Sequence, residues 1–291
     1  MSEKPIVSIV TPCYNAEKYI RMTIASVLNQ TAFLNNRATL DYTIVDGGST
    51  DETLRIINDM INTSPLKDCV KVISEPDKGM YDALVKGMKL ARGEIFSYLN
   101  ADDYYNITAV DVVLTIMENY PIKWLTGYDT HYNGEGHITL VHCPHRFRRK
   151  FIIQGIYGTK LQYIQQESTF WRRELNNLID FETLRSLKYA GDYYLWLEFS
   201  KKNSLFIVET YLGGFRHRTG QLSQSKGYHA ERQTFCPLRA TIFDKFVILK
   251  DKIYWRMSKL SRIFNCVKNE DKEYIHFIYD VKKNKWMPLT M

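Results

Sequence analysis

The chain has 291 residues, of which 45% are hydrophobic and 24% charged, so the composition predicts a packed core and excludes a disordered protein. Its apolar runs are too short and too often interrupted by charges to predict a bilayer-spanning helix, and the segment MSEKPIVSIV lacks the apolar stretch of a signal peptide. The 5 cysteines are scattered and include no C-x-x-C pair, which predicts neither a disulfide framework nor a zinc site and fits a reducing cytoplasm.

The positive charge is unevenly distributed along the chain. Residues 226–291 contain 14 Lys and Arg but only 7 Asp and Glu, so they carry the whole formal excess of +7. The first 225 residues are electrically balanced. We therefore expect a domain over residues 1–225 and a basic, mainly helical extension over residues 226–291.

The first hundred residues alternate between strand and helix patterns. Strands are predicted at 6–11 (IVSIVT), 42–46 (YTIVD), 70–74 (VKVIS) and 95–99 (IFSYL), with helices at 16–30, 53–61 and 80–91 between them. Ser49 and Glu52 have the spacing of a capping box for the second helix. This order predicts a Rossmann-like, mostly parallel sheet flanked by helices, with right-handed crossovers.

The middle of the chain has a weaker pattern. The segment GYDTHYNGEGHITLV predicts a hairpin that turns at Asn133 and Gly134. The segments STFWRRELNN (168–177) and GDYYLWLEFSKK (191–202) are interpreted as short helices. Phe170, Trp171 and Trp196 are expected in the core.

The stretch SYLNADDYY places adjacent carboxylates directly after a predicted strand. Asn100, Asp102 and Asp103 then lie on the same sheet edge as Thr11 and Asp46, where α/β sheets bind ligands. Two neighbouring carboxylates could simply begin a helix. They could also bind Mg²⁺ or Mn²⁺ shared with a nucleotide diphosphate, because these ions prefer oxygen ligands and assist the departure of a diphosphate.

Five blocks taken together resemble a family 2 glycosyltransferase with the GT-A fold: VSIVTPCYNAEKYIRMTIASVLNQT, YTIVDGGSTDETLRII, SEPDKGMYDALVKGMKLARGEIFSYLNADD, QQESTFWRR and GDYYLWLEF. The resemblance covers about residues 5–223. It implies an inverting transfer of a sugar from a nucleotide-diphosphate sugar, expected to be a UDP-sugar, to a hydroxyl of a glycan or lipid-linked acceptor. It also implies Mn²⁺ or Mg²⁺ as cofactor and a place in cell-surface polysaccharide biosynthesis.

The resemblance assigns roles to individual residues, and the nucleotide-sugar side comes first. Thr11, Pro12 and Tyr14 match the first nucleotide-contacting turn. Asp46 is expected near the uracil or ribose, and a base-side segment is matched by two further residues, Asp77 and Lys78.

The reacting groups are assigned in the same way. Asp102 matches the metal ligand of the family's D-x-D motif, and Asp103 is expected to support it. Asn100 stands where the motif has its first Asp, so it can bond a ribose hydroxyl but adds no charge. Asp192, in GDYYLW, matches the catalytic base.

Two further departures from the family pattern affect these roles. The family often has Asp-Asp-Gly-Ser after the second strand, whereas Gly47 replaces one of the carboxylates here. The family's F-R-x-H-x-G has its His at the position of Arg218, and His217 comes one residue earlier. A metal-binding role for His217 is therefore not expected, and Arg216 or Arg218 is expected to contact a diphosphate oxygen.

Two of the carboxylates also have structural interpretations. Asp46 could cap the turn with Ser49, which is compatible with a binding role. Asp192 could be the N-cap of its helix. The pattern alone favours the cap, whereas the resemblance favours the base.

The extension contains the segment DKIYWRMSKLSRIF (251–264). It would place Ile253, Met257, Leu260 and Phe264 on one helical face, with Lys252, Arg256 and Lys259 on another. Such a helix can dock on its own domain or lie on an anionic membrane, which would put a cytoplasmic protein at the inner membrane face. No nucleic-acid partner is expected, because no recognition motif accompanies the basic residues.

Two other functions remain as alternatives. A sugar-phosphate nucleotidyltransferase shares a similar sheet, but it would carry a Gly-rich basic loop in place of TPCYNAEKY. A non-catalytic nucleotide-sugar-binding protein of the same fold would not need Asp46, Asp102 and Asp192. The sugar and the acceptor depend on the shape of the loops between residues 121 and 167.

Overall fold

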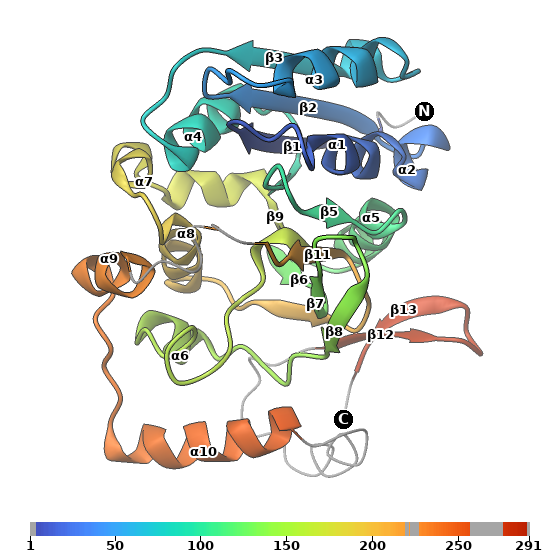
Figure 1. The fold of residues 1–291 in the computed structure, drawn as a ribbon. Helices are drawn as coiled ribbons and strands as arrows, with labels where there is room; N and C mark the ends of the chain where they lie inside the picture. Colours follow the sequence, from blue (N-terminus) through green and yellow to red (C-terminus); the bar gives the residue numbers. More distant parts are fainter. Residues whose placement is uncertain (1–3, 219–220, 222–226, 257–275, 290–291) are drawn as a thin grey trace.

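The computed structural model describes residues 4–218, 221, 227–256 and 276–289, and the first of these segments begins with alternating strands and helices (Figure 1). The elements up to the fourth strand are β1 (Ile6–Cys13), α1 (Ile20–Leu28), α2 (Thr31–Leu34), β2 (Thr39–Asp46), α3 (Thr53–Asn62), the short 3₁₀ helix η1 (Lys67–Cys69), β3 (Val70–Ser74), α4 (Met80–Leu90) and β4 (Ile95–Tyr98). This alternation is as predicted.

The rest of the chain mixes short strands and helices. Its elements are β5 (Tyr104–Tyr105), α5 (Ala109–Asn119), β6 (Trp124–Thr126), β7 (Asp129–Tyr132), β8 (Ile138–His142), α6 (Arg149–Ile153), η2 (Gln166–Ser168), β9 (Thr169–Arg172), η3 (Arg173–Leu178), α7 (Phe181–Ser186), α8 (Gly191–Ser200), β10 (Phe206–Val208), β11 (Gly213–Arg216), α9 (Gly227–Phe235), α10 (Ile242–Arg256), β12 (His276–Asp280) and β13 (Lys285–Pro288).

Within the described residues, the main sheet has the strand order β13-β12-β10-β6-β9-β4-β1-β2-β3. β1, β2, β3 and β4 are mutually parallel where they pair, and so are β6, β10 and β12. β9 runs antiparallel to both β4 and β6 and joins the two parallel groups. The predicted mostly parallel α/β sheet is confirmed, and the carboxyl ends of both groups point to one edge.

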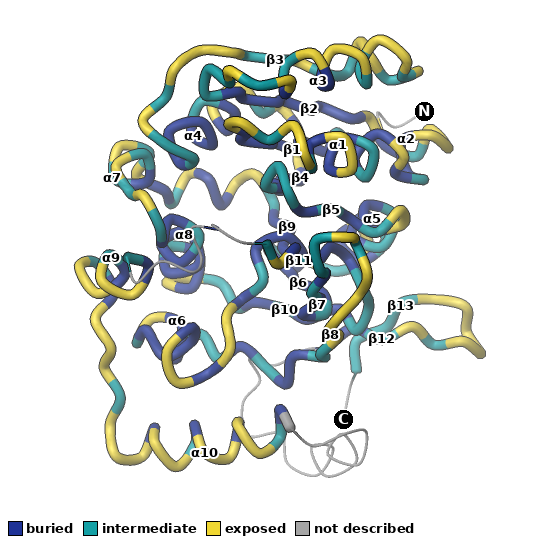
Figure 2. Tube along the Cα trace, in the orientation of Figure 1, coloured by how far each residue is buried: buried dark blue, intermediate teal, exposed yellow. Residues whose placement is uncertain are grey.

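Hydrophobic side chains cover both faces of this sheet. One cluster includes residues of α4, α7 and α8, and the other includes residues of α1, α3 and α5. Phe170, Trp171 and Trp196 are at most 1% exposed, so their predicted place in the core is confirmed. The ring of Trp196 stacks on Trp124 at 5.6 Å, which packs α8 against the centre of the sheet. The buried strands and helix faces are visible in Figure 2.

A smaller sheet has the order β5-β11-β7-β8. β7 and β8 form the predicted hairpin, and Asn133 N–H donates to the carbonyl of His137 at 3.0 Å to close its turn. β11 pairs with both β5 and β7. Residues that follow β4 and β10 are thereby held next to the hairpin.

The prediction of a helix over residues 168–177 is wrong at its start. Thr169–Arg172 forms β9, a central strand of the main sheet, and only the residues after it form the 3₁₀ helix η3. Thr169, Phe170 and Trp171 are fully buried between β4 and β6. Pairing with these distant strands determines the conformation, because β-branched and aromatic residues suit a buried strand.

The predicted capping box before α3 is also wrong. Ser49 bonds the carboxylate of Asp46 instead of the helix, and α3 begins at Thr53. Asp51 bonds the first turn of α3 instead, because its Oδ1 accepts a hydrogen bond from the main-chain N–H of Thr53 at 3.0 Å. The hydroxyl of Ser49 therefore bonds the end of β2 and does not cap α3.

The carboxyl-terminal segment is not helical throughout. α9 and α10 agree with the expectation, but β12 and β13 form a hairpin, and β12 pairs with β10 in the main sheet. Residues after 225 thus contribute a strand to the sheet of the first 225. α10 ends at Arg256, and Met257, Lys259, Leu260 and Phe264 lie outside the described residues. None of the described helices is long and apolar enough to cross a membrane.

Candidate active site

The first predicted contact lies at the end of β1. Thr11 and Pro12 are buried, and the Thr11 hydroxyl accepts a hydrogen bond from Tyr42 at 2.9 Å. Tyr14, just beyond the strand, is 62% exposed. Among these three predicted residues, Tyr14 is the one whose side chain is open to a ligand.

Asp46 ends β2 and is completely buried. Its Oδ2 accepts from the N–H groups of Gly48 and Ser49, at 3.2 and 3.0 Å, and from the Ser74 hydroxyl at 2.7 Å. Its Oδ1 bonds the Ser49 hydroxyl. The carboxylate therefore builds the turn, as the structural interpretation of this residue predicted, and it shapes the nucleotide side of the edge through the backbone.

Asp77 occupies the space that a side chain at residue 47 would need. A Cβ atom on Gly47 would lie 2.6 Å from Oδ2 of Asp77. Asp77 is half-buried, and burial raises the pKa of its carboxyl above the usual range. It thus supplies a carboxylate beside the position at which the family pattern has its second Asp. Lys78 is exposed beside it.

Asn100 follows β4 and connects to the middle of the chain. Its amide nitrogen donates to Gln166 Oε1 at 3.1 Å, and it lies 3.4 Å from Asp103 Oδ2. Its Oδ1 is buried and has no hydrogen-bond partner within the described residues. A buried acceptor without a partner is destabilising, so a ligand hydroxyl or a cation would be favoured there.

Asp102 is paired with Arg218. Arg218 Nε–H donates to Asp102 Oδ2 at 2.5 Å, and the amide of Gln221 lies 3.4 Å from the same oxygen. Arg218 stands at the family's His position and points to the expected metal ligand. His217 points elsewhere and contacts the ring of His131.

Asp103 and Arg216 join the loop after β4 to the end of β11. Asp103 is completely buried, and its Oδ1 accepts from the main-chain N–H of Arg216 at 2.8 Å. The guanidinium of Arg216 is 1% exposed and donates to the carbonyls of Asp102 and Gly134, at 2.9 and 3.0 Å. Asp103 and Arg216 therefore hold the loop after β4 in position, whereas Arg218 is the arginine whose side chain contacts the carboxylate of Asp102.

Asp192 lies in the first turn of α8 and is half-buried. Its Oδ1 accepts from Tyr193 N–H at 2.6 Å, and its Oδ2 accepts from the Tyr228 hydroxyl at 3.4 Å. The Tyr81 hydroxyl bonds the main-chain N–H of Asp192 at 3.2 Å. Burial raises the pKa of this carboxyl to about 7, which suits a group that takes up a proton near neutral pH.

Glu167 is a further candidate residue, to which the resemblance assigned no role. It is 2% exposed, its Oε1 has no partner within the described residues, and burial raises the pKa of its carboxyl to about 8. The charges of Asp192 and Asp102 contribute to this rise, so Glu167 lies within electrostatic reach of both. The signal in the sequence was the acidic residue in QQES, directly before β9.

The described residues fit a divalent cation of the Mg²⁺ or Mn²⁺ type. Asp102 offers a half-buried carboxylate, and Asn100 offers a buried oxygen without a partner, so the donor set consists of oxygen atoms. Arg218 already compensates one charge on Asp102. A cation would share Asp102 with Arg218 or displace it.

A mostly parallel sheet with Asp102 just beyond β4 and Asp192 in the first turn of α8 is the arrangement expected of a glycosyltransferase with the GT-A fold. The model of the family "Glycosyl transferase family 2" matches residues 8–187. The chain therefore belongs to glycosyl transferase family 2 and is a glycosyltransferase.

Relatives in this family include polymer synthases and smaller enzymes. A chondroitin synthase of Escherichia coli is 38% identical over 110 residues, which are 38% of this chain and 15% of that protein. An uncharacterized glycosyltransferase of Haemophilus influenzae is 27% identical over 223 residues, 76% of this chain and 82% of its own. The Escherichia coli "UDP-Glc:alpha-D-GlcNAc-diphosphoundecaprenol beta-1,3-glucosyltransferase WfaP" is 25% identical over 245 residues, 79% and 84% of the two chains.

Solved structures share the fold at low sequence identity. S. aureus TarS 1-349 in complex with UDP-GlcNAc superposes with a TM-score of 0.61 at 17% identity, over 87% of this chain and 68% of that chain. M. tuberculosis glucosyl-3-phosphoglycerate synthase, in complex with Mn²⁺, UDP and glucosyl-3-phosphoglycerate, gives a TM-score of 0.53 at 16% identity, over 81% and 82% of the two chains. These similarities confirm the GT-A architecture.

Proposed function

We propose that this glycosyltransferase moves a sugar from a UDP-sugar to a hydroxyl of a glycan or lipid-linked acceptor, with inversion at the anomeric carbon. One observation carries the proposal: the edge of the sheet holds two carboxylates in different environments. Asp102 is paired with a guanidinium, whereas Asp192 has a pKa of about 7 through burial. Separated environments give two carboxylates separate tasks.

Asp192 is the proposed general base. With a pKa of about 7 it can accept the proton of an acceptor hydroxyl while remaining largely ionised above neutral pH. The Tyr193 N–H and the Tyr228 hydroxyl fix its two oxygens. Once deprotonated, the acceptor oxygen attacks the anomeric carbon from the side opposite the diphosphate. A single base is sufficient for this displacement, which inverts the anomeric configuration.

The donor diphosphate would lie against the loop after β4 and the segment after β11. Arg218 carries its positive charge there, and Tyr14 and Asp77 face the same strand-end edge from β1 and from the segment after β3. Mn²⁺ or Mg²⁺ held by Asp102 and the oxygen of Asn100 would neutralise negative charge on the leaving diphosphate. Arg218 adds a second positive charge to the same region.

The relatives support the choice of donor and pathway. The family includes a glucosyltransferase named for UDP-Glc and an undecaprenol-linked acceptor, as well as chondroitin synthases. By this analogy we place the enzyme in the synthesis of a cell-surface polysaccharide, on the cytoplasmic side of a membrane. The family assignment favours this function over a nucleotidyltransferase or a binding protein.

Donor turnover tests this proposal directly. Purified protein is incubated with a panel of sugar nucleotides, and release of nucleoside diphosphate is measured with Mn²⁺, with Mg²⁺ and with chelator. We expect release from one or more UDP-sugars, dependent on the cation, and a steep loss in Asp102→Asn. The matched control is Asp59→Asn on the exposed side of α3. Full activity of the parent in chelator would exclude the cation role of Asp102.

We also propose that α10 contacts the membrane that carries the acceptor. Its inward face is formed by four buried residues: Asp244, Ile248, Asp251 and Trp255. Asp244 pairs with Lys150 at 2.7 Å, and Asp251 pairs with Arg148 at 2.9 Å. Both acidic residues of α10 are thus turned toward the protein.

The outward face of α10 is apolar and positively charged. Phe243 is 82% exposed and Phe246 68%, and Ile242, Leu249 and Ile253 are exposed as well. Figure 2 colours most of α10 as exposed. Three exposed lysines lie along the helix: Lys245, Lys250 and Lys252. Exposed aromatic and aliphatic residues flanked by lysines, with the acids turned inward, characterise a helix that lies on an anionic bilayer. Figure 1 shows α10 at the side of the molecule remote from β1, β2 and β3.

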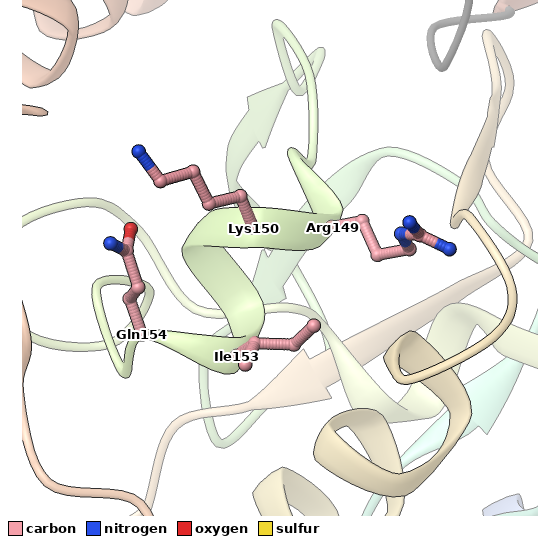
Figure 3. A pocket seen from close by; sticks show the side chains of 4 residues that line it. All are labelled: Arg149, Lys150, Ile153 and Gln154. Atoms are coloured by element: carbon pink, nitrogen blue, oxygen red, sulfur yellow. The ribbon is translucent and has the colours of Figure 1, made fainter.

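A shallow hollow beside α10 fits the same partner. It is lined by Arg149, Lys150 and Ile153 of α6 and by Gln154, which directly follows α6 (Figure 3). Lys150 and Gln154 also bond Asp244, so the hollow adjoins α10. Lys150 is already paired with Asp244, so the hollow adds the positive charge of Arg149 to the surface next to α10, which suits an anionic lipid headgroup.

A further inference from the structure

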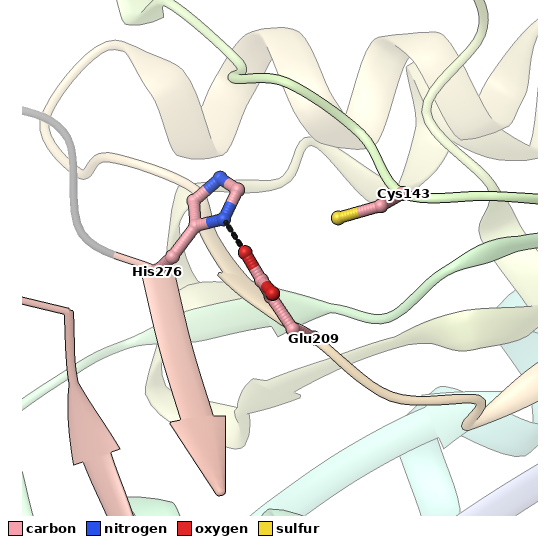
Figure 4. Close-up of side chains that lie close together, drawn as sticks. All are labelled: Cys143, Glu209 and His276. Carbon is pink, nitrogen blue, oxygen red and sulfur yellow. Dashed lines mark hydrogen bonds and ion pairs between the residues drawn. The ribbon is translucent and has the colours of Figure 1, made fainter. Parts of the chain in front are cut away.

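Three side chains with metal-binding atoms converge at a place that the transfer reaction does not use. Cys143 directly follows β8, Glu209 directly follows β10, and His276 is the first residue of β12. The Cys143 sulfur, a Glu209 carboxylate oxygen and a ring nitrogen of His276 all lie within 4.8 Å of one another. Figure 4 shows the sulfur pointing toward the other two side chains.

The hydrogen bonds of His276 define the state of its ring. Nε2 lies 2.9 Å from the carbonyl oxygen of His145, and a carbonyl can only accept, so Nε2 carries a hydrogen. Nδ1 lies 2.8 Å from the Glu209 carboxylate. If the ring were neutral, Nδ1 would be an acceptor, and it would face the Glu209 carboxylate, which is also an acceptor, in a buried position. A cation between them resolves the conflict, and it is either a proton on Nδ1 or a metal ion.

The orientation of the ring matches that of a metal ligand. Metal-binding histidines commonly donate their second N–H to a backbone carbonyl, which fixes the tautomer and directs the other nitrogen to the metal. His276 has this arrangement with His145. A proton would satisfy Nδ1 and Glu209 but would make no use of the Cys143 sulfur, which lies 3.6 Å from the carbonyl oxygen of Pro144. A metal ion uses all three atoms.

The donor set selects the ion. Sulfur, imidazole nitrogen and carboxylate oxygen together suit Zn²⁺, which binds them at about 2.0–2.3 Å. Three atoms within 4.8 Å of one another need side-chain shifts of less than ~1 Å to close around the ion. The thiolate and the carboxylate balance its two charges. His276 is 3% exposed, and an uncompensated charge at such a buried position would be unfavourable.

We propose that Cys143, Glu209 and His276 bind a zinc ion that fastens β12 to β10 and to the chain after β8. Binding releases the thiol proton of Cys143 and any proton held between His276 and Glu209. The site would fix the carboxyl-terminal hairpin on the edge of the main sheet. It is separate from Asp102, so it does not depend on the proposed function.

The experiment uses the full chain, stripped with chelator and kept with a reductant that does not bind metals. Co²⁺ is added first, since a thiolate ligand gives a sulfur-to-cobalt charge-transfer band. We expect this band in the parent and in Asp102→Asn, and its loss in Cys143→Ser. Cys69→Ser, which removes another half-buried thiol, is the control and should keep the band.

Zinc affinity is then measured by competition with a chromophoric chelator. Cys143→Ser and His276→Gln should weaken one tight site by more than the roughly 10–100-fold typical of losing an outer partner of a ligand. Zn²⁺ should also raise the melting temperature of the parent but not of Cys143→Ser. The proposal is overturned if the parent shows no sulfur band, or if Cys143→Ser binds Zn²⁺ as tightly as Cys69→Ser. Circular dichroism verifies that each variant is folded.

Discussion

The Nε–H group of Arg218 donates to Oδ2 of Asp102 at 2.5 Å, and this ion pair joins the segment after β11 to the segment after β4. It puts a fixed positive charge beside the carboxylate that we expect to bind the cation. Arg218 and the cation therefore compete for Asp102, while both stabilise the leaving diphosphate.

Replacing Arg218 should separate these two effects. In Arg218→Gln we expect transfer to fall by about 10²-fold, the order seen when one charge-stabilising donor is removed. The Mn²⁺ concentration for half-maximal activity should fall as well, because Asp102 loses a competitor. Arg55→Gln, which removes an exposed guanidinium on α3, should change neither quantity. An unchanged rate and an unchanged Mn²⁺ requirement would show that Arg218 has only a structural role.

The second prediction concerns the pH dependence of Asp192. A general base must be ionised, so the transfer rate should rise with pH through about 7 and then level off. Asp192→Asn should lower transfer by roughly 10²–10⁴-fold and abolish this rise, while leaving the binding of UDP with Mn²⁺ intact. A folded Asn variant that transfers sugar at nearly the parental rate would exclude Asp192 as the base.

The same substitution has an expected effect on stability. Burial raises the folded-state pKa of Asp192 to about 7, above its unfolded value of 3.8, so the folded protein loses stability as pH rises between these values. The upper limit is about 1.4 kcal/mol for each pKa unit. Asp192→Asn should therefore melt no lower than the parent at pH 5 and higher than it at pH 8. A purely capping Asp192 predicts a lower melting temperature at both pH values.

Glu167 gives a contrast to Asp192. With a pKa raised to about 8 by burial, its carboxyl is mostly protonated at pH 7, and Gln resembles the protonated form. Glu167→Gln should therefore keep transfer within about tenfold of the parent at pH 7, well short of the loss that removal of a general base causes. Glu167→Ala should unfold at lower temperature, because it leaves a cavity beside β11. A loss with Gln as large as that of Asp192→Asn would make Glu167 the base.

The fifth prediction tests the membrane contact of α10. Phe243→Gln with Phe246→Gln should reduce binding to vesicles of phosphatidylglycerol, and so should replacement of Lys245, Lys250 and Lys252 by Gln. Each lysine near the surface contributes about 1 kcal/mol, and salt should weaken binding of the parent. Phosphatidylcholine vesicles should bind less of the parent.

A matched control replaces exposed apolar residues elsewhere. Ile107→Gln with Val281→Gln changes side chains that are 54% and 82% exposed, and should leave vesicle binding unchanged. If the parent does not bind vesicles but sediments as a dimer that the Phe243 and Phe246 changes dissociate, the face of α10 is occupied by a second copy of the chain.

The sequence predicted the first four strands and their helices correctly because each has a clear periodic pattern. It did not predict β9, since Thr169–Arg172 becomes a strand only by pairing with two distant strands. It also did not predict the hairpin of β12 and β13, whose strands of 5 and 4 residues are too short for a clear periodic pattern and join the sheet at its edge.

For the candidate site, the motifs indicated which residues follow the strands but not where their side chains point. The resemblance indicates Asp46 near the nucleotide, and the structure adds that its oxygens hold the turn after β2. Arg216 and Arg218 could not be told apart by spacing, and the structure buries the first and directs the second to Asp102. The QQES segment points to Glu167, but its burial and its raised pKa follow only from the fold.

The contact between Gly47 and Asp77 has an evolutionary consequence. Oδ2 of Asp77 lies 2.6 Å from the place where a Cβ atom on residue 47 would be. A change from Gly47 to Asp, which would restore the common family motif, is therefore blocked unless Asp77 moves or changes first. The two positions are therefore coupled: a carboxylate at residue 47 requires the side chain of residue 77 to rotate away from the Gly79 N–H group that it now accepts from, or to be replaced.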